Sequence, residues 1–113
     1  MAIYGQSMVD IPEGYGPDDE LDSEAADPLY LQLAAVLISR IESGTYPLGR
    51  AVPGVDRLMQ EFGIARGTAR KTLVLLAELR YVRTVVGKGS FVIEREPGEP
   101  PAPRTQEKDQ PDD

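Results

Sequence analysis

Four side chains that can contact nucleic acid lie close together in this sequence: Arg66, Thr68, Arg70 and Lys71. Arginine can donate two parallel hydrogen bonds to a guanine edge, threonine can contact a phosphate or a thymine methyl group, and lysine supplies positive charge. These residues follow Gly63, which favours a tight turn, and they continue into an apolar, helix-forming segment. A turn followed by a helix with basic first residues is typical of a helix-turn-helix, whose second helix enters the major groove.

The same basic residues have a less specific interpretation. Arg66, Arg70 and Lys71 are also compatible with an ordinary solvated helix face. We favour nucleic-acid binding because they follow the turn directly, where the positive end of the helix dipole attracts phosphate.

A long helix is predicted ahead of this region. Asp27 and Pro28 predict its start, with Asp27 as the N-cap and Pro28 at the first helical position. Gly44 is placed to end the helix in a left-handed conformation. The apolar residues that recur between these ends at spacings of three and four are Tyr30, Leu33, Leu37 and Ile41.

Two shorter helices flank the turn. The first is amphipathic and ends at Gly63. Its apolar residues are Val55, Leu58, Met59 and Phe62. The second begins near Arg66 and has a predicted buried stripe, which leaves Arg66, Gly67, Arg70 and Lys71 facing outward. The residues of that stripe are Ala69, Leu73, Leu76 and Leu79.

A β-hairpin is predicted after the last helix. Two β-forming runs, residues 81–86 and 90–93, are separated by Gly87-Lys88-Gly89. The glycines supply positive φ angles and allow close approach of a ligand to the backbone, so the hairpin has a basic tip. A plain hairpin turn is the alternative interpretation. A very short third strand at residues 51–52 completes the predicted sheet.

Charge divides the chain into three segments. Residues 1–27 contain eight acidic and no basic residues, residues 28–95 contain ten basic and five acidic residues, and residues 96–113 contain six acidic and two basic residues. The ends are rich in Gly or Pro and lack periodic apolar residues. We therefore expect a disordered acidic arm at 1–26, one folded domain at 27–95 and a disordered Pro-rich acidic tail after it.

Composition excludes several classes of function. The chain of 113 residues supports one modest core, and it contains no Cys, His or Trp. Thiol and imidazole chemistry, disulfides and zinc sites that need nitrogen or sulfur ligands are therefore excluded, and we expect no enzymatic activity, no metal and no cofactor. No apolar run reaches the roughly 20 residues of a membrane helix, and the N-terminus is acidic. We expect a cytoplasmic protein without a membrane partner.

Three helices followed by this hairpin constitute an α+β winged helix-turn-helix. From Pro28 to Ile93 the sequence resembles the N-terminal domain of GntR-family bacterial transcription regulators. The four matching segments are residues 28–30, 43–49, 63–70 and 87–92. The resemblance implies a sequence-specific transcription regulator, with repression as its expected action and double-stranded DNA as its partner.

The resemblance also assigns roles to individual residues. Arg66, Gly67, Thr68 and Arg70 match the family's major-groove contacts, and Gly87-Lys88-Gly89 matches the wing that reaches toward the minor groove. Family members usually bind a two-fold operator as dimers, so a homodimer is also implied.

The sequence departs from the family pattern at three positions. Where the family has an Arg in the second helix this chain has Asp56, and Arg57, about 100° around the helix, is the candidate replacement. The Ser or Thr before the recognition helix is Ala65, which removes an N-cap worth about 1 kcal/mol. The Gly after that helix is Arg80.

A fourth departure concerns the family's effector domain. In its place residues 96–103 are mostly Pro, Gly and Glu, which predicts neither helix nor strand. We therefore expect no small-molecule effector site.

A second class of function stays open. A winged helix can serve as a protein-interaction module that holds a partner protein through its basic face or its acidic tails. The acidic tails are most simply solubility segments, and the alternative is that they compete with DNA for the basic face. Arg66 and Arg70 discriminate between the two classes, because specific DNA binding requires them and binding through the tails does not.

Overall fold

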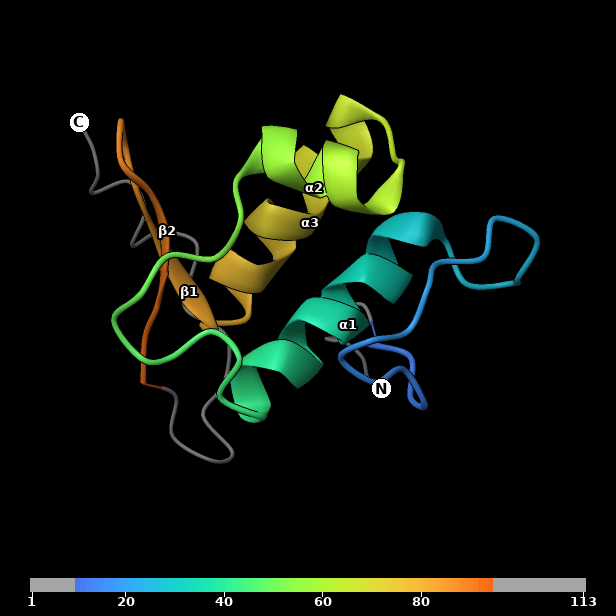
Figure 1. The fold of residues 1–113 in the computed structure, drawn as a ribbon, viewed down its shortest axis with the longest axis horizontal. Helices are drawn as coiled ribbons and strands as arrows, with labels where there is room; N and C mark the ends of the chain where they lie inside the picture. Colours follow the sequence, from blue (N-terminus) through green and yellow to red (C-terminus); the bar gives the residue numbers. More distant parts are fainter. Residues whose placement is uncertain (1–9, 95–113) are drawn as a thin grey trace, which may run out of the picture.

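The computed structural model describes residues 10–94, which form three helices and a two-stranded sheet (Figure 1). The elements are α1 (Leu29–Glu42), α2 (Val55–Phe62), α3 (Arg66–Glu78), β1 (Val82–Val85) and β2 (Gly89–Val92). Helix α3 packs against both α1 and α2 and leads directly into β1. The predicted α+β winged helix-turn-helix is confirmed.

Glycines end the first two helices as predicted. Gly44 follows α1 with φ +86°, and Gly63 follows α2 with φ +68°. The start of α1 differs from the prediction by one residue. Pro28 occupies the N-cap position with an extended ψ, and no side chain caps the helix. The Asp27 carboxylate instead accepts a hydrogen bond from the Tyr15 hydroxyl at 3.4 Å.

The core lies where α1, α2, α3 and the sheet meet. Its fully buried aliphatic side chains include Leu33, Leu37, Leu58, Leu76 and Val82.

The buried stripe of α3 is rotated relative to the prediction. Ala69 and Leu76 are buried as expected, whereas Leu73 and Leu79 are only partly buried. Leu75 and Thr72 take the remaining buried positions. Thr72 is tolerated there because its hydroxyl donates to the carbonyl of Thr68 at 2.9 Å, so the buried polar group has a partner.

The sheet is a hairpin supported by the preceding loop. Strands β1 and β2 are antiparallel, with Val82 opposite Val92 and Val85 opposite Gly89. Ala51 forms a single antiparallel bridge with Phe91, so the predicted strand at 51–52 is reduced to one bridge. The loop also donates the Val52 N–H to the Ser90 carbonyl at 2.9 Å. These bonds attach β2 to the loop between α1 and α2.

The acidic arm packs on the domain over its described part, residues 10–26, and in this it differs from the predicted disordered arm. The amide of Gln32, fully buried in α1, accepts a hydrogen bond from the Asp22 N–H and donates to the carbonyls of Asp22 and Asp27, at 2.7 to 2.9 Å. Ile11 and Leu21 of the arm also pack against the hydrophobic core. A buried amide requires such partners, and the backbone of the arm supplies them. Residues 1–9 and the predicted tail at 96–113 lie outside the described residues.

Arg40 joins the arm to α1 and α2. Its guanidinium donates to the Pro17 carbonyl at 2.8 Å, to the Tyr46 hydroxyl at 2.6 Å and to the Glu61 carboxylate at 2.8 Å. It also lies over the rings of Tyr46 and Phe62. Partial burial alone lowers the pKa of Arg40, but the hydrogen bonds to Glu61 and Tyr46 outweigh it and raise the pKa. Arg40 therefore links the arm, the loop after α1 and helix α2.

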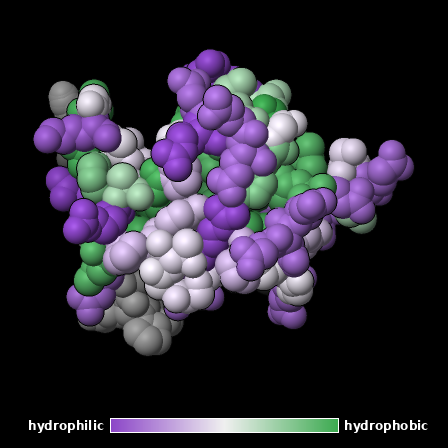
Figure 2. All heavy atoms as spheres, viewed as in Figure 1, coloured by the Kyte–Doolittle hydropathy of each residue, from purple (hydrophilic) through white to green (hydrophobic). Residues whose placement is uncertain are grey.

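Hydrophilic side chains dominate the surface over α2 and over the arm, as Figure 2 shows for one face of the domain. Hydrophobic residues are exposed between these regions and along part of the hairpin. None of the described helices has the length and apolar character needed to cross a membrane.

Candidate nucleic-acid interface

The turn between α2 and α3 has a fixed geometry. The Gly63 N–H donates to the Met59 carbonyl at 2.9 Å, and the next side chain, Ile64, is buried in the core. Ala65 is extended and begins α3 without a side-chain cap, as its methyl group requires. The first backbone N–H groups of α3 therefore have no capping side chain in front of them, at the positive end of the helix dipole.

Four of the five predicted contact residues on α3 are exposed. Arg66, Gly67, Arg70 and Lys71 face solvent, and Thr68 is half-buried. Arg66 and Arg70 are one helical turn apart, so they project from the same side of α3. The structure thus presents two guanidinium groups together just after the turn.

Lys71 extends toward α1. Its ammonium group lies 4.1 Å from the centre of the Tyr30 ring, a cation–π distance. Tyr30 is the second residue of α1, so Lys71 lies at the border between α3 and α1 and apart from the side of Arg66 and Arg70.

An acidic residue lies beside Arg66. The Nη2 atom of Arg66 is 3.2 Å from the Oδ1 atom of Asp56, in the first turn of α2. Both side chains are well exposed, at 55% for Arg66 and 85% for Asp56. Arg57, the predicted replacement for the missing arginine, is also exposed on α2. The sequence indicates only a lost arginine contact at Asp56, because no local pattern links residues of two helices.

The hairpin tip has the predicted backbone. Gly87 has φ +81° and Gly89 has φ +129°, and between them the Lys88 N–H donates to the Val85 carbonyl at 2.9 Å. Gly87, Lys88 and Gly89 are all exposed, and Val86 beside them is 95% exposed. The tip and the start of α3 both lie along the upper edge of the domain in Figure 1.

One basic residue of the hairpin was missed by sequence reasoning. Arg83 is exposed on β1, next to the buried Val82. The alternation of inward and outward residues along a strand was the available signal, since it places Arg83 opposite the core-facing side.

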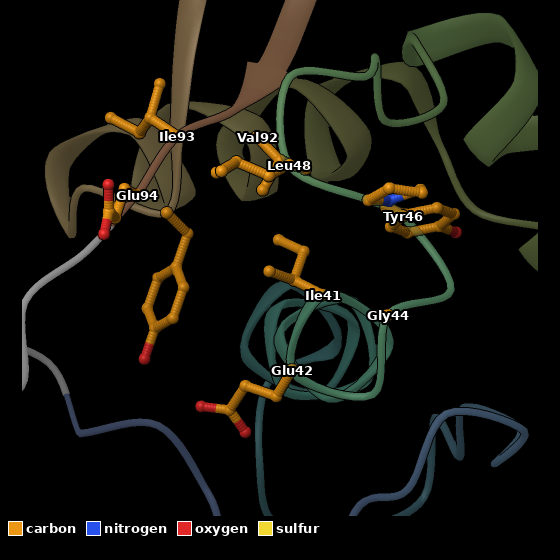
Figure 3. Close-up of a pocket in the computed structure, with 10 residues that line it drawn as sticks. Ile41, Glu42, Gly44, Tyr46, Leu48, Val92, Ile93 and Glu94 are labelled. Carbon is orange, nitrogen blue, oxygen red and sulfur yellow. The ribbon is translucent and has the colours of Figure 1, made fainter.

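A hollow of about 460 Å³ lies at the other end of the domain, between the end of α1, the loop after it and the end of β2 (Figure 3). Its lining is largely apolar, with Ile41, Tyr46 and Leu48, and its charged residues are Glu42 and Glu94. Such a lining lacks the positive charge that a nucleic acid requires. Among residues 10–94, no group of three acidic side chains is arranged to hold a metal ion.

Comparison with known protein families identifies the chain. The model of the family described as bacterial regulatory proteins, gntR family, matches residues 29–92, which is more than half of the sequence. This chain belongs to the gntR family. The match begins at the first residue of α1 and ends at the last residue of β2. It therefore covers every helix and strand that the structure describes.

Two curated gntR relatives illustrate the similarity. The chain is 32% identical over 72 residues to the uncharacterized HTH-type transcriptional regulator YurK of Bacillus subtilis, covering 64% of this chain and 30% of the relative. It is 36% identical over 67 residues to the mannosyl-D-glycerate transport/metabolism system repressor MngR of Escherichia coli, covering 59% of this chain and 28% of the relative. The chain thus spans less than a third of the length of these relatives.

Two solved structures have a similar fold. The DNA-binding domain of AraR in complex with operator ORE1 is 35% identical with a TM-score of 0.58, covering 64% of this chain and 88% of that one. YtrA from Sulfolobus acidocaldarius, a GntR-family transcription factor, is 26% identical with a TM-score of 0.58, covering 72% and 68%. The comparisons favour a DNA-binding regulator and lend no support to a protein-interaction module.

Proposed function

We propose that this chain is a sequence-specific DNA-binding regulator of transcription, acting as a repressor. The proposal rests on two exposed arginines, Arg66 and Arg70, which lie one helical turn apart at the start of α3. They follow the loop in which Gly63 adopts a left-handed conformation. AraR, whose solved domain is bound to its operator, and MngR, a named repressor, support it by similarity.

The proposed contacts on α3 follow from the chemistry of each group. Arg66 and Arg70 each donate two hydrogen bonds to a guanine edge in the major groove. Thr68 contacts a phosphate or a thymine methyl group, and Gly67 allows the backbone to approach the DNA closely. Lys71 adds positive charge near the phosphates at the border with α1.

The hairpin and α2 supply contacts that carry less sequence information. Lys88, between Gly87 and Gly89, reaches toward the minor groove as a charge on an exposed tip. Arg57 on α2 approaches a phosphate. A homodimer on a two-fold operator is part of the proposal, with α3 of each copy in one half-site, because symmetric operators match symmetric dimers.

Fluorescence anisotropy tests the proposal. The probe is the duplex upstream of this protein's own gene, compared with a scrambled duplex at low and near-physiological salt. We expect a preference for the native duplex that survives added salt, because base contacts depend less on released counterions than phosphate contacts do. Equal binding to both duplexes that disappears with salt would contradict the proposal.

Two variants locate the contact. Arg66→Ala is expected to weaken the preference, because one bidentate guanine contact is lost. Arg50→Ala removes the same charge from an exposed loop before the sheet and is expected to preserve the preference. Equal effects of the two variants would show that Arg66 does not read the sequence.

A further inference from the structure

We infer that Asp56 is a specificity-determining residue of this domain and acts through Arg66. Its carboxylate orients the guanidinium toward base edges and discourages contacts with phosphate, so Asp56 sets the preference for the cognate sequence over random DNA. The inference rests on the proposed function, because it assumes that Arg66 reads DNA.

The contact leaves most of Arg66 available. One nitrogen, Nη2, lies 3.2 Å from the carboxylate of Asp56, and the side chain is 55% exposed. A guanidinium carries five N–H donors, and a bidentate contact with guanine uses two of them. Asp56 therefore restricts the rotation of Arg66 while leaving a free edge for a base.

The position of Asp56 favours this role over a structural one. Asp56 lies in the first turn of α2, where the helix dipole favours a carboxylate, and its side chain is 85% exposed. Exposed ion pairs contribute little to stability, so the fold does not depend on this contact. The carboxylate is instead placed where α2 and α3 meet, next to a residue proposed to reach DNA.

The two binding modes of Arg66 respond differently to this acid. When Arg66 contacts a phosphate, Asp56 is brought near a second negative charge and the two repel each other. When Arg66 contacts a guanine edge, its partner is uncharged and that repulsion is smaller. Asp56 therefore disfavours the phosphate contact of Arg66, which is the same for every sequence, more than the guanine contact. Repulsion of this kind increases specificity because it weakens binding to non-cognate DNA.

Parallel selection from a randomised DNA duplex pool tests this inference. The wild-type chain, Asp56→Asn and Arg66→Ala are each used to select duplexes, which are then sequenced. We expect Asp56→Asn and Arg66→Ala to lose guanine preference at the same base-pair position. Asp56→Asn is also expected to bind random duplex about threefold more tightly and to lower the ratio of cognate to random affinity about fivefold.

Two controls separate positioning from net charge. Glu78→Gln makes the same charge change at the last residue of α3, on an exposed side chain, and is expected to leave the selected sequence unchanged. Asp56→Glu keeps the charge and is expected to restore guanine preference at the affected position. In an Arg66→Ala background, Asp56→Asn is expected to cause no further loss of preference.

The outcomes are distinct. If Asp56→Asn selects the wild-type sequence and strengthens binding no more than Glu78→Gln, the inference is overturned while the proposed function stands. If the wild-type chain selects no sequence at all, the proposed function fails and the inference fails with it. Loss of preference at the position read by Arg66, together with recovery in Asp56→Glu, supports the inference.

Discussion

Arg40 and Arg66 are the same type of residue in contrasting surroundings. The side chain of Arg40 is 14% exposed and donates to a backbone carbonyl, a hydroxyl and a carboxylate. The side chain of Arg66 is 55% exposed and has one acidic neighbour, Asp56, at 3.2 Å. Arg40 holds segments of this chain together, and Arg66 keeps donors available for another molecule. Burial and partners, more than residue type, separate the structural arginine from the one proposed to bind.

The largest effect is expected from removing Arg40. Arg40→Ala deletes three hydrogen bonds and the packing against two rings, and it leaves the Glu61 carboxylate without its partner. We expect the free energy of unfolding to fall by about 3 kcal/mol. Urea denaturation measures this free energy. Arg66→Ala is the control, and its free energy of unfolding is expected to lie within about 0.5 kcal/mol of wild type. Equal stability of both variants would remove the contrast between the two arginines.

The next effect concerns DNA affinity. Arg66→Ala or Arg70→Ala is expected to cost about 1 to 3 kcal/mol at the cognate site and to relax the base preference there, because a bidentate guanine contact is lost. Anisotropy titrations against cognate and random duplexes measure both quantities. Equal losses on the two duplexes would show that these arginines contact only phosphates.

A smaller effect is expected at the hairpin tip. Lys88→Ala removes one exposed charge and is expected to weaken binding to cognate and random duplexes alike, by about threefold at low salt. The slope of affinity against salt should become shallower by about one phosphate contact. A loss confined to the cognate duplex would instead indicate that the hairpin reads sequence.

The smallest effect is expected at the end of α3. Arg80 follows α3 with φ +70°, a left-handed conformation. Glycines, Gly44 and Gly63, adopt this conformation after the other two helices. Arg80→Gly is expected to raise the free energy of unfolding by about 0.5 kcal/mol, because relief of the left-handed backbone exceeds the entropy cost of glycine. Gly63→Ala, at a site with open space for a Cβ atom, is the converse control and is expected to lower stability. A lower free energy of unfolding for Arg80→Gly would show that the Arg80 side chain stabilises the fold by more than its left-handed backbone destabilises it.

Local signals in the sequence predicted most of the fold. The ends of α1 and α2 depend on Gly44 and Gly63, whose left-handed conformations need no tertiary information. The hairpin follows from two β-forming runs around Gly87-Lys88-Gly89. The exposure of Arg66 and Arg70 follows from the helical period once α3 is placed.

Features that depend on contacts between distant residues were not predictable in this way. The arm packs on the domain because Gln32 and Arg40 bond to its backbone, and no periodic pattern marks either residue as a partner. The buried face of α3 differs from the predicted one in part because it includes the polar residue Thr72. Its hydroxyl can be buried there because it donates a hydrogen bond to the Thr68 carbonyl. Asp56 and Arg66 meet only because the turn brings two helices together.

The packing of the arm changes what its charges do when the domain approaches a duplex. Residues 10–27 carry eight acidic side chains, and the bonds made by Gln32 and Arg40 tie their backbone to α1. In Figure 1 the arm runs from the lower centre to the right, and the basic hairpin tip lies at the upper left. The acidic arm and the basic tip therefore lie on different sides of the described domain. A protein with its charges separated in this way turns its positive side toward a polyanion before contact. This orientation raises the fraction of encounters that lead to binding.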